Sequence, residues 1–315
     1  MKKSLLSAAL VVTLSALPAL AADLPVKAMK APPPPPLSWW EIAYGGAIMS
    51  DYNFRGVSQS DCSIAGTFYV EGRVNVIPEK LQIYGGIQPY TVKLPTEPTG
   101  EFDFYGGIRS IWGPVTFDFG AIYYYYPRES QIFVLPTAGP VGVGFPTSQP
   151  NGNPLYIPWT VADTDFWEIY GKVTWTVNDW LALGAYVYYS PDLLGSGAEG
   201  TYAGGTVKLT LPSAWFPADF GAYISGEFAH YWIGVTGPVL GNVNLPDYNY
   251  WNAGIAFTYK IFTLDLRYHD TDLTRAQCFT LTGDLNGLDT GRRPGLSNWC
   301  GEAFIAKLAI DTTIK

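Results

Sequence analysis

The clearest pattern in the chain is an alternation of apolar and polar residues between positions 167 and 175. The apolar set begins and ends with tryptophan, at Trp167 and Trp175, whereas Glu168 and Lys172 belong to the mostly polar set between them. A strand rises about 3.3 Å per residue and tilts by about 40° in a barrel, so this segment covers about 20 Å, close to the apolar height of an outer membrane. A soluble sandwich shows the same alternation, so repetition has to decide between the two.

Strand patterns of this kind recur along the chain. Twelve segments carry them, at about residues 38–50, 65–76, 80–90, 100–111, 114–126, 165–176, 180–190, 201–211, 218–231, 249–260, 261–270 and 302–314. The links alternate in length: short ones fall near 78–79, 113–114, 178–179, 212–217 and 260–261, and long ones at 51–64, 91–99, 127–164, 191–200, 232–248 and 271–301. Outer-membrane barrels sort short periplasmic turns from long external loops. We therefore predict an all-β fold, a 12-stranded antiparallel transmembrane β-barrel over residues 38–315 with both termini periplasmic.

The N-terminal residues indicate export. Two lysines precede an apolar run that ends at the small-residue site Ala19-Leu20-Ala21, which predicts a signal peptide over residues 1–21. Beyond it, no uninterrupted apolar stretch approaches the roughly 20 residues that a spanning helix needs. Residues 22–37 are proline-rich and are expected to form an extended periplasmic spacer, or a contact with the cell wall or a protein. The predicted location is the cell outer membrane.

Charge and cysteine content narrow the class of protein. The chain has 19 Lys and Arg against 27 Asp and Glu, and removal of the signal peptide takes two lysines and no acid, which leaves a formal net charge of −10. This acidic balance argues against nucleic acid as a partner. Because the periplasm is oxidising, we expect a disulfide between Cys278 and Cys300, which bracket the last long loop, and a single Cys62 beneath a loop.

The alternation also assigns the two faces of each strand. The more continuous apolar set is taken as lipid-facing, which places Phe68, Val70, Val74 and Val76 outside. The ionisable residues of the opposite face are expected to line the pore: Glu71, Arg73, Asp103, Arg109, Asp118, Glu168, Lys172, Lys208, Asp219, Glu227, Lys260, Asp265, Arg267, His269, Lys307 and Asp311. Both signs of charge occur, so the interior is either a pore with a transverse field or a sealed network of salt bridges.

A Tyr-Gly-Gly sequence occurs three times, at residues 44–46, 84–86 and 105–107. Glycine removes bulk at curved positions of a barrel, and a neighbouring aromatic ring covers the bare backbone, so we interpret these glycines as structural. The first copy makes the register of its strand ambiguous, which leaves Glu41 unassigned.

One segment resembles a known family. Residues 50–61 read SDYNFRGVSQSD, which is similar to the N-terminal signature of the TorF-type porin family of Gram-negative outer membranes. The resemblance runs from about Trp40 to the C-terminus and includes the aromatic strand at 123–127 and the segment 167–170. It implies a barrel more firmly than it implies a solute. This chain departs from many outer-membrane barrels in ending on lysine, at Ile314-Lys315, rather than on an aromatic residue.

Catalysis has little support in the sequence. Nucleophile and base sets need histidine or paired groups within reach, and only His230 and His269 are present. We expect His230 to face lipid or the rim, and His269 to have a structural or selectivity role in preference to that of a membrane esterase. Asp270 and Asp272 do not have the spacing of an oxygen-ligand loop. We predict a non-enzyme with no catalytic residue, no metal site and no cofactor.

The long link at 128–164 is unusual because it combines prolines and glycines with apolar groups such as Ile132-Phe133-Val134. It is too apolar for a freely solvated tether. Either it folds inward and narrows the pore, or it forms an external flap or a subunit contact, and loop sequence does not decide between these.

The function predicted from the sequence is passive diffusion of small hydrophilic solutes or ions through an outer-membrane pore. The main alternative is a non-conducting structural or adhesive barrel that acts through its external loops. The expected partners are outer-membrane lipid and lipopolysaccharide, the outer-membrane assembly machinery and small solutes. The oligomeric state stays open.

Overall fold

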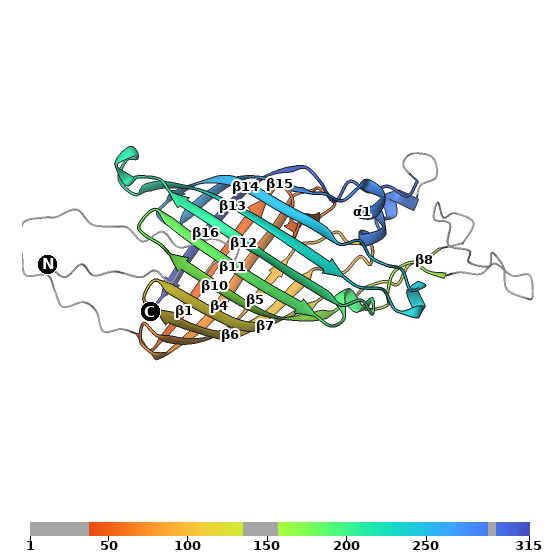
Figure 1. The fold of residues 1–315 in the computed structure, drawn as a ribbon, viewed down its shortest axis with the longest axis horizontal. Coiled ribbons are helices and arrows are strands. Elements are labelled where there is room, and N and C mark those ends of the chain that lie inside the picture. Colours follow the sequence, from red (N-terminus) through yellow and green to blue (C-terminus); the bar gives the residue numbers. More distant parts are fainter. Residues whose placement is uncertain (1–37, 135–156, 289–293) are drawn as a thin grey trace, which may run out of the picture.

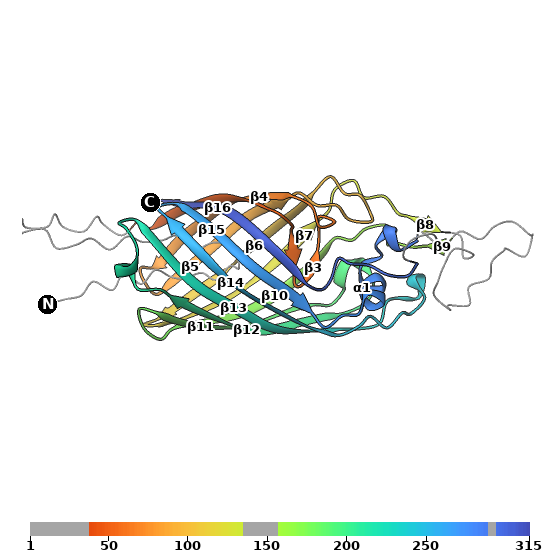
Figure 2. The ribbon, with the colours of Figure 1, turned by 90° about the horizontal axis from the view of Figure 1, so that it is seen from above.

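A closed barrel forms the body of the protein. The structure is a computed structural model and describes residues 38–134, 157–288 and 294–315. Within these residues, twelve antiparallel strands close on themselves, as Figures 1 and 2 show from two directions. They are β1 (Trp40–Met49), β4 (Ala65–Ile77), β5 (Leu81–Tyr90), β6 (Glu101–Trp112), β7 (Val115–Tyr125), β10 (Phe166–Thr176), β11 (Leu181–Ser190), β12 (Gly200–Thr210), β13 (Phe220–Ile233), β14 (Tyr248–Tyr259), β15 (Phe262–Thr271) and β16 (Ala303–Ile314). The predicted all-β, 12-stranded antiparallel barrel is confirmed.

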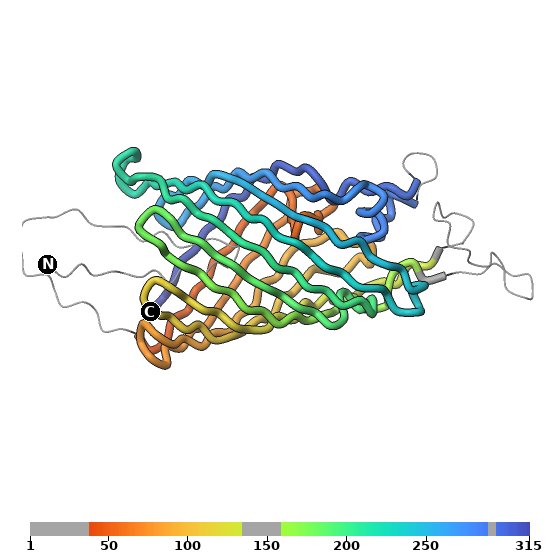
Figure 3. Tube along the Cα trace, in the orientation of Figure 1, coloured from red at the N-terminus to blue at the C-terminus, as the bar shows by residue number. Residues whose placement is uncertain are grey.

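The connections sort by length between the two ends of the barrel. Turns of two to four residues join β4 to β5, β6 to β7, β10 to β11 and β14 to β15. They lie at the end where the chain finishes, together with the longer link 211–219 between β12 and β13, and the other long segments gather at the opposite end (Figure 3). Pairing of Ile42 with Ile314 places the start of β1 beside the end of β16. We call these two ends the turn end and the loop end.

Short elements lie at the loop end and, in one case, in the link between β12 and β13 at the turn end. They are β2 (Asn53–Phe54), β3 (Val57–Ser58), β8 (Phe133–Val134), β9 (Ile157–Pro158), α1 (Arg275–Thr282) and the 3-10 turns η2 (Leu193–Gly195), η3 (Ser213–Trp215), η4 (Pro238–Leu240) and η5 (Leu285–Leu288). Helix α1 begins at a capping box between Thr274 and Gln277 and ends at Gly283, whose φ is 62°. In the described part of the chain, no helix has both the length and the apolar character to cross a membrane.

The outer face of the barrel is apolar. Phe68 is 57% exposed, and the valines that share its face of β4 are exposed as well, as predicted. Exposed tryptophans lie near both ends of the strands, with Trp112 and Trp175 toward the turn end and Trp167 and Trp232 toward the loop end. Two aromatic girdles around an apolar band are typical of barrels that span a lipid bilayer.

Tyrosines and glycines pair across adjacent strands on the inner face. Tyr84 lies opposite Gly107, and Gly86 lies opposite Tyr105. A Cβ at Gly107 would lie 2.6 Å from the hydroxyl oxygen of Tyr84, and one at Gly86 would lie 2.7 Å from Cζ of Tyr105. Each ring therefore occupies the space that a side chain on the facing strand would fill, which agrees with the structural interpretation of these glycines.

Three predictions concern residues outside the described part of the chain. The signal peptide, residues 1–21, and the proline-rich segment, residues 22–37, both precede it. Residues 135–156, the centre of the link considered as a constriction loop, also lie outside it.

Candidate functional site in the barrel lumen

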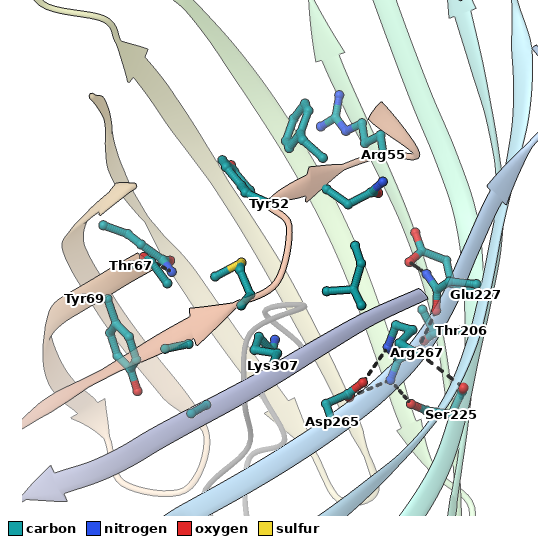
Figure 4. Close-up of a pocket in the computed structure, with 18 of the residues that line it drawn as sticks. Tyr52, Arg55, Thr67, Tyr69, Thr206, Ser225, Glu227, Asp265, Arg267 and Lys307 are labelled. Atoms are coloured by element: carbon teal, nitrogen blue, oxygen red, sulfur yellow. Dashed lines mark hydrogen bonds and ion pairs between the residues drawn. The ribbon is translucent and has the colours of Figure 1, made fainter. Parts of the chain in front are cut away.

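A hairpin from the first long loop enters the barrel. We call residues 51–62 the inner hairpin; it contains β2 and β3, which pair with each other (Figure 4). Asn53 Oδ1 accepts a hydrogen bond of 2.9 Å from the Gly56 N–H, which closes the tip. Gly56 has φ of 89°, and a Cβ there would lie 2.2 Å from Cγ2 of Thr271. The tip thus needs glycine for its backbone conformation and for its close fit against β15.

The base of the inner hairpin is held by short hydroxyl contacts. The carboxylate of Asp51 accepts hydrogen bonds from Ser58 Oγ at 2.6 Å and from Ser60 Oγ at 2.8 Å. The hairpin is also attached to the last loop, because the Ser58 N–H donates to the Trp299 carbonyl at 2.8 Å and Val57 forms a β-bridge with Cys300. These contacts explain why serines and aspartates recur in this segment.

Arg55 lies at the tip and crosses the lumen. Its two terminal nitrogens each donate to a carboxylate oxygen of Glu168 on β10 at 2.7 Å, and one also donates to the Tyr231 hydroxyl at 3.0 Å. The guanidinium carbon lies 4.4 Å from the ring centre of Tyr202 and 4.8 Å from that of Tyr188. The ion pair is almost completely buried. Bidentate pairing and stacking together fix the orientation of the guanidinium.

Electrostatics keep this arginine charged. Burial is the largest single influence and opposes the charged form, but Glu168, Tyr231 and Tyr124 together outweigh it, so the pKa of Arg55 is raised above its usual value. Its backbone φ of 52° is also unusual for a residue with a side chain. The barrel therefore holds a strained, charged residue in one position by contacts with several strands.

A second anchor joins the inner hairpin to β6. The Tyr52 hydroxyl donates to Glu101 Oε1 at 2.6 Å, and the Tyr126 hydroxyl donates to Oε2 at 2.8 Å. The Tyr52 ring is stacked on Tyr90, with centroids 4.3 Å apart. Burial and the neighbouring Glu101 charge raise the pKa of Tyr52 well above its ordinary range, so its hydroxyl stays protonated and donates.

A cavity of about 370 Å³ lies beneath the inner hairpin. Eleven of the sixteen residues predicted to line the pore face it: Asp103, Arg109, Asp118, Lys172, Lys208, Glu227, Asp265, Arg267, His269, Lys307 and Asp311. Glu71, Arg73 and Glu168 lie on the inner side of the barrel in ion pairs without lining the cavity.

Two predicted pore residues lie elsewhere. Asp219 precedes β13 and Lys260 follows β14, both exposed in turns at the turn end with φ of 65° and 52°. Neither residue belongs to a strand and neither lines the cavity, so the assignment of both to the pore lining is corrected. Glu41, which the sequence left unassigned, pairs with Arg73 at 3.9 Å and with Lys315 at 3.6 Å.

One ionic network crosses the wall formed by β4, β6 and β7. Arg109 donates to Glu71 at 2.9 Å and to Asp118 at 3.2 Å, and its guanidinium lies 3.6 Å from the centre of the Tyr84 ring. Arg73 donates to the same Glu71 carboxylate at 2.6 Å. The two arginines and two carboxylates of this network therefore compensate one another's charge.

A second network lies on β13, β14 and β15. Arg267 donates to Asp265 at 2.9 Å, to Asn252 at 2.6 Å and to Ser225 Oγ at 2.7 Å, as Figure 4 shows in part. Glu227 accepts from the Tyr202 hydroxyl and from Asn252 at 2.8 Å each. Most hydrogen-bonding capacity of this wall is used within the protein.

The two histidines have different surroundings. His269 shares a 2.8 Å hydrogen bond with the Tyr250 hydroxyl and faces the cavity. His230 lies half-buried against Trp232, with Nδ1 2.9 Å from Asn249 Oδ1.

The structure pairs Cys278 with Cys300, as predicted. This bridge joins α1 to the residue that contacts the inner hairpin. Cys62 is a free thiol and is exposed, which corrects the expectation that a loop covers it.

The inner hairpin is an inserted segment that the sequence did not single out, and whether the 128–164 link folds inward stays a prediction because its centre lies outside the described residues. In the described part of the 128–164 link, Trp159 donates to the Gly283 carbonyl at 2.9 Å and packs against Phe279 of the last loop. Arg55 is a site residue that the sequence did not reveal, because its position within residues 50–61 was the only signal for it. A buried arginine needs a partner, and nothing local predicted Glu168.

The described residues contain one group of carboxylates close enough to hold a metal ion, Glu129, Asp163 and Asp165. Glu129 already accepts from the Thr164 N–H at 2.6 Å, and Asp165 accepts from the Tyr126 N–H at 2.7 Å. These carboxylates organise loop backbone, and we assign no metal to them.

Comparison with known proteins gives a partial family match. Residues 35–133 match the model of a family described as "Bacterial protein of unknown function (Gcw_chp)", and these residues include the inner hairpin. No curated protein matches the chain. Similar solved structures include LpxR from Salmonella typhimurium (9% identity, 85% of this chain and 99% of that chain, TM-score 0.40), the NanC porin (10%, 85% and 98%, 0.40) and the toluene transporter TodX of Pseudomonas putida (10%, 87% and 88%, 0.40).

Proposed function

We propose that this chain forms a porin-like channel in the outer membrane and admits small hydrophilic solutes or ions by passive diffusion. The observation that carries the proposal is the cavity of about 370 Å³ inside the barrel, which is lined by ionisable side chains of both signs. A barrel of this strand number falls between small barrels that side chains fill and large porins with open channels.

Outer-membrane location is part of the proposal. The apolar outer face and its two tryptophan girdles support it, since a soluble protein rarely exposes so extended an apolar surface. The resemblance of residues 50–61 to the TorF-type porin family supports it as well. Lipid, lipopolysaccharide and the assembly machinery are the corresponding proposed partners.

The inner hairpin is the proposed constriction. It holds Arg55 across the lumen at the loop end, where Arg55 lines the cavity, so a solute that enters from that side passes beside the guanidinium. The ionisable residues that line the cavity, rather than a single residue, would then set the ion preference of the channel.

Conductance of the purified protein in a planar bilayer tests this function. We expect discrete current steps from the full chain and larger steps from a variant in which residues 52–59 are replaced by a glycine-serine linker. A known open porin at the same protein concentration serves as the positive control. Silence of both forms, while the control conducts, would contradict the channel.

A non-conducting structural barrel is the second candidate. The observation in its favour is the buried Arg55–Glu168 pair, which fixes the inner hairpin within the lumen. Silence combined with binding to peptidoglycan or to host cells would support it. We propose no enzymatic activity, and ester hydrolysis that a His269→Gln substitution abolishes would contradict this.

A further inference from the structure

We propose that the lumen binds small organic anions, with Lys172, Lys208 and Lys307 supplying the ammonium groups that hold them. This inference rests on the proposed channel and names the class of solute that it would admit. The three lysines come from β10, β12 and β16 and line the same cavity.

The first step in the argument is the difference between arginines and lysines in the cavity. Arg55, Arg109 and Arg267 are each in an ion pair with a carboxylate. Across the described residues, none of the three cavity lysines lies within 4.0 Å of a carboxylate oxygen. The cavity therefore has three ammonium groups that no carboxylate of the described residues pairs with.

The second step is the state of the facing carboxylates. Asp265 is paired with Arg267, and Asp118 is paired with Arg109 and also accepts from Tyr84. Asp103 and Asp311 each keep one oxygen without a partner among the described residues, but those two oxygens are buried within the wall. Both oxygens of Asp118, Asp265 and Glu227 thus already accept hydrogen bonds within the protein, whereas no carboxylate in the described part of the chain forms an ion pair with the three lysines.

The third step concerns the walls beside the lysines. Nζ of Lys172 lies 4.1 Å from the centre of the Tyr170 ring and 5.2 Å from that of Tyr188. Nζ of Lys208 lies 4.0 Å from the centre of the Tyr223 ring. A ring face attracts an ammonium without neutralising it, and offers an apolar surface to the body of a bound solute. A carboxylate on a small apolar body fits these surroundings.

Equilibrium binding to the detergent-solubilised full chain is the first test, because it does not depend on conduction. The probes are sodium benzoate, neutral benzamide and benzylammonium chloride, and isothermal titration calorimetry measures the dissociation constant of each. We expect benzoate to bind at least about tenfold more tightly than the other two, because only it accepts charge-assisted hydrogen bonds from ammonium groups. Equal or tighter binding of benzylammonium, or no binding of benzoate, would overturn the inference without any variant.

Substitution of the lysines is the second test. In a K172Q/K208Q/K307Q variant, benzoate affinity should fall at least about tenfold, since each lost charged donor removes a strong contact. Lys260→Gln is the matched control, because Lys260 is exposed in a turn and does not line the cavity. A shift in electrophoretic mobility between heated and unheated samples checks that the triple variant is folded. Unchanged benzoate affinity in a folded triple variant would overturn the inference.

Current measurements separate this inference from the channel itself. Benzoate should reduce the potassium chloride current of the wild type more than benzylammonium does. A silent barrel that still binds benzoate through the lysines would reject the channel and support the anion site. A conducting barrel without benzoate binding would do the reverse.

Discussion

Arg55 and Glu168 are 113 residues apart in the chain, and their side chains meet in two parallel hydrogen bonds of 2.7 Å. The contact joins the tip of the inner hairpin, which follows β1 in the chain, to β10, which is not a neighbour of β1 in the barrel. It makes the tip of the first long loop part of the barrel interior.

Removal of one member of this pair should release the inner hairpin. Arg55→Gln leaves the Glu168 carboxylate buried without its partner, which typically costs about 3 kcal/mol or more. We expect faster proteolysis within residues 51–62 and higher conductance, with the barrel strands intact by circular dichroism. The R55Q/E168Q double variant is the control and should recover part of the loss. Equal protease resistance of R55Q and wild type would show that the pair does not hold the hairpin.

The tip glycine should tolerate no side chain. Gly56→Ala introduces a methyl group 2.2 Å from Cγ2 of Thr271 in addition to its left-handed backbone. Gly113→Ala is the matched control, because Gly113 also has positive φ, 58°, with no atom within 4 Å of the added Cβ. The control should lose only about 1–2 kcal/mol through its backbone, and Gly56→Ala clearly more. Urea denaturation compares the two, and identical losses would argue against the tight fit at the tip.

High pH should weaken the attachment of the inner hairpin. An unfolded tyrosine loses its proton near pH 10, whereas Tyr52 and Tyr126 in the folded protein have a pKa raised well above that value, by burial first and by Glu101 next. Above about pH 10 the unfolded state therefore binds fewer protons than the folded one, and stability falls as pH rises. The stabilisation is fully present below that pH. Protease access to the hairpin between pH 8 and 11 measures the effect.

The Tyr52→Phe variant tests the cause of that pH dependence. It should be less stable at neutral pH by about 1.5–3 kcal/mol, the usual contribution of a hydrogen bond to a charged group, and should show a shallower alkaline decline. An alkaline decline as steep as that of the wild type would point to other groups.

The disulfide should support the inner hairpin indirectly. The bridge closes a 22-residue separation, and its loss typically costs about 3 kcal/mol. Because Cys300 is next to Trp299 and bridges Val57, a C278S/C300S variant should expose the hairpin to protease as well as α1. In the unreduced wild type, alkylation should label Cys62 alone. Label on three cysteines without reductant would contradict the bridge.

Sequence alone gave the barrel, its strands and the inward face of most ionisable residues, because strand alternation is a local signal that repeats. It failed at Asp219 and Lys260, where the residue types continue the alternation although Asp219 lies just before β13 and Lys260 just after β14, each with a positive φ. It also did not predict which loop enters the lumen. That outcome depends on contacts such as Tyr52 with Glu101 and Arg55 with Glu168, which join residues far apart in the chain.

The β-bridge between Val57 and Cys300 has a consequence for assembly. The inner hairpin directly follows β1, and Cys300 directly precedes β16, the two strands whose pairing completes the ring. Docking of the hairpin thus ties together the first and last parts of the chain to be brought side by side. A barrel in which β1 and β16 have not yet paired lacks this bridge. Once the ring has closed, the bridge adds to the contacts that hold these two strands together and opposes their separation.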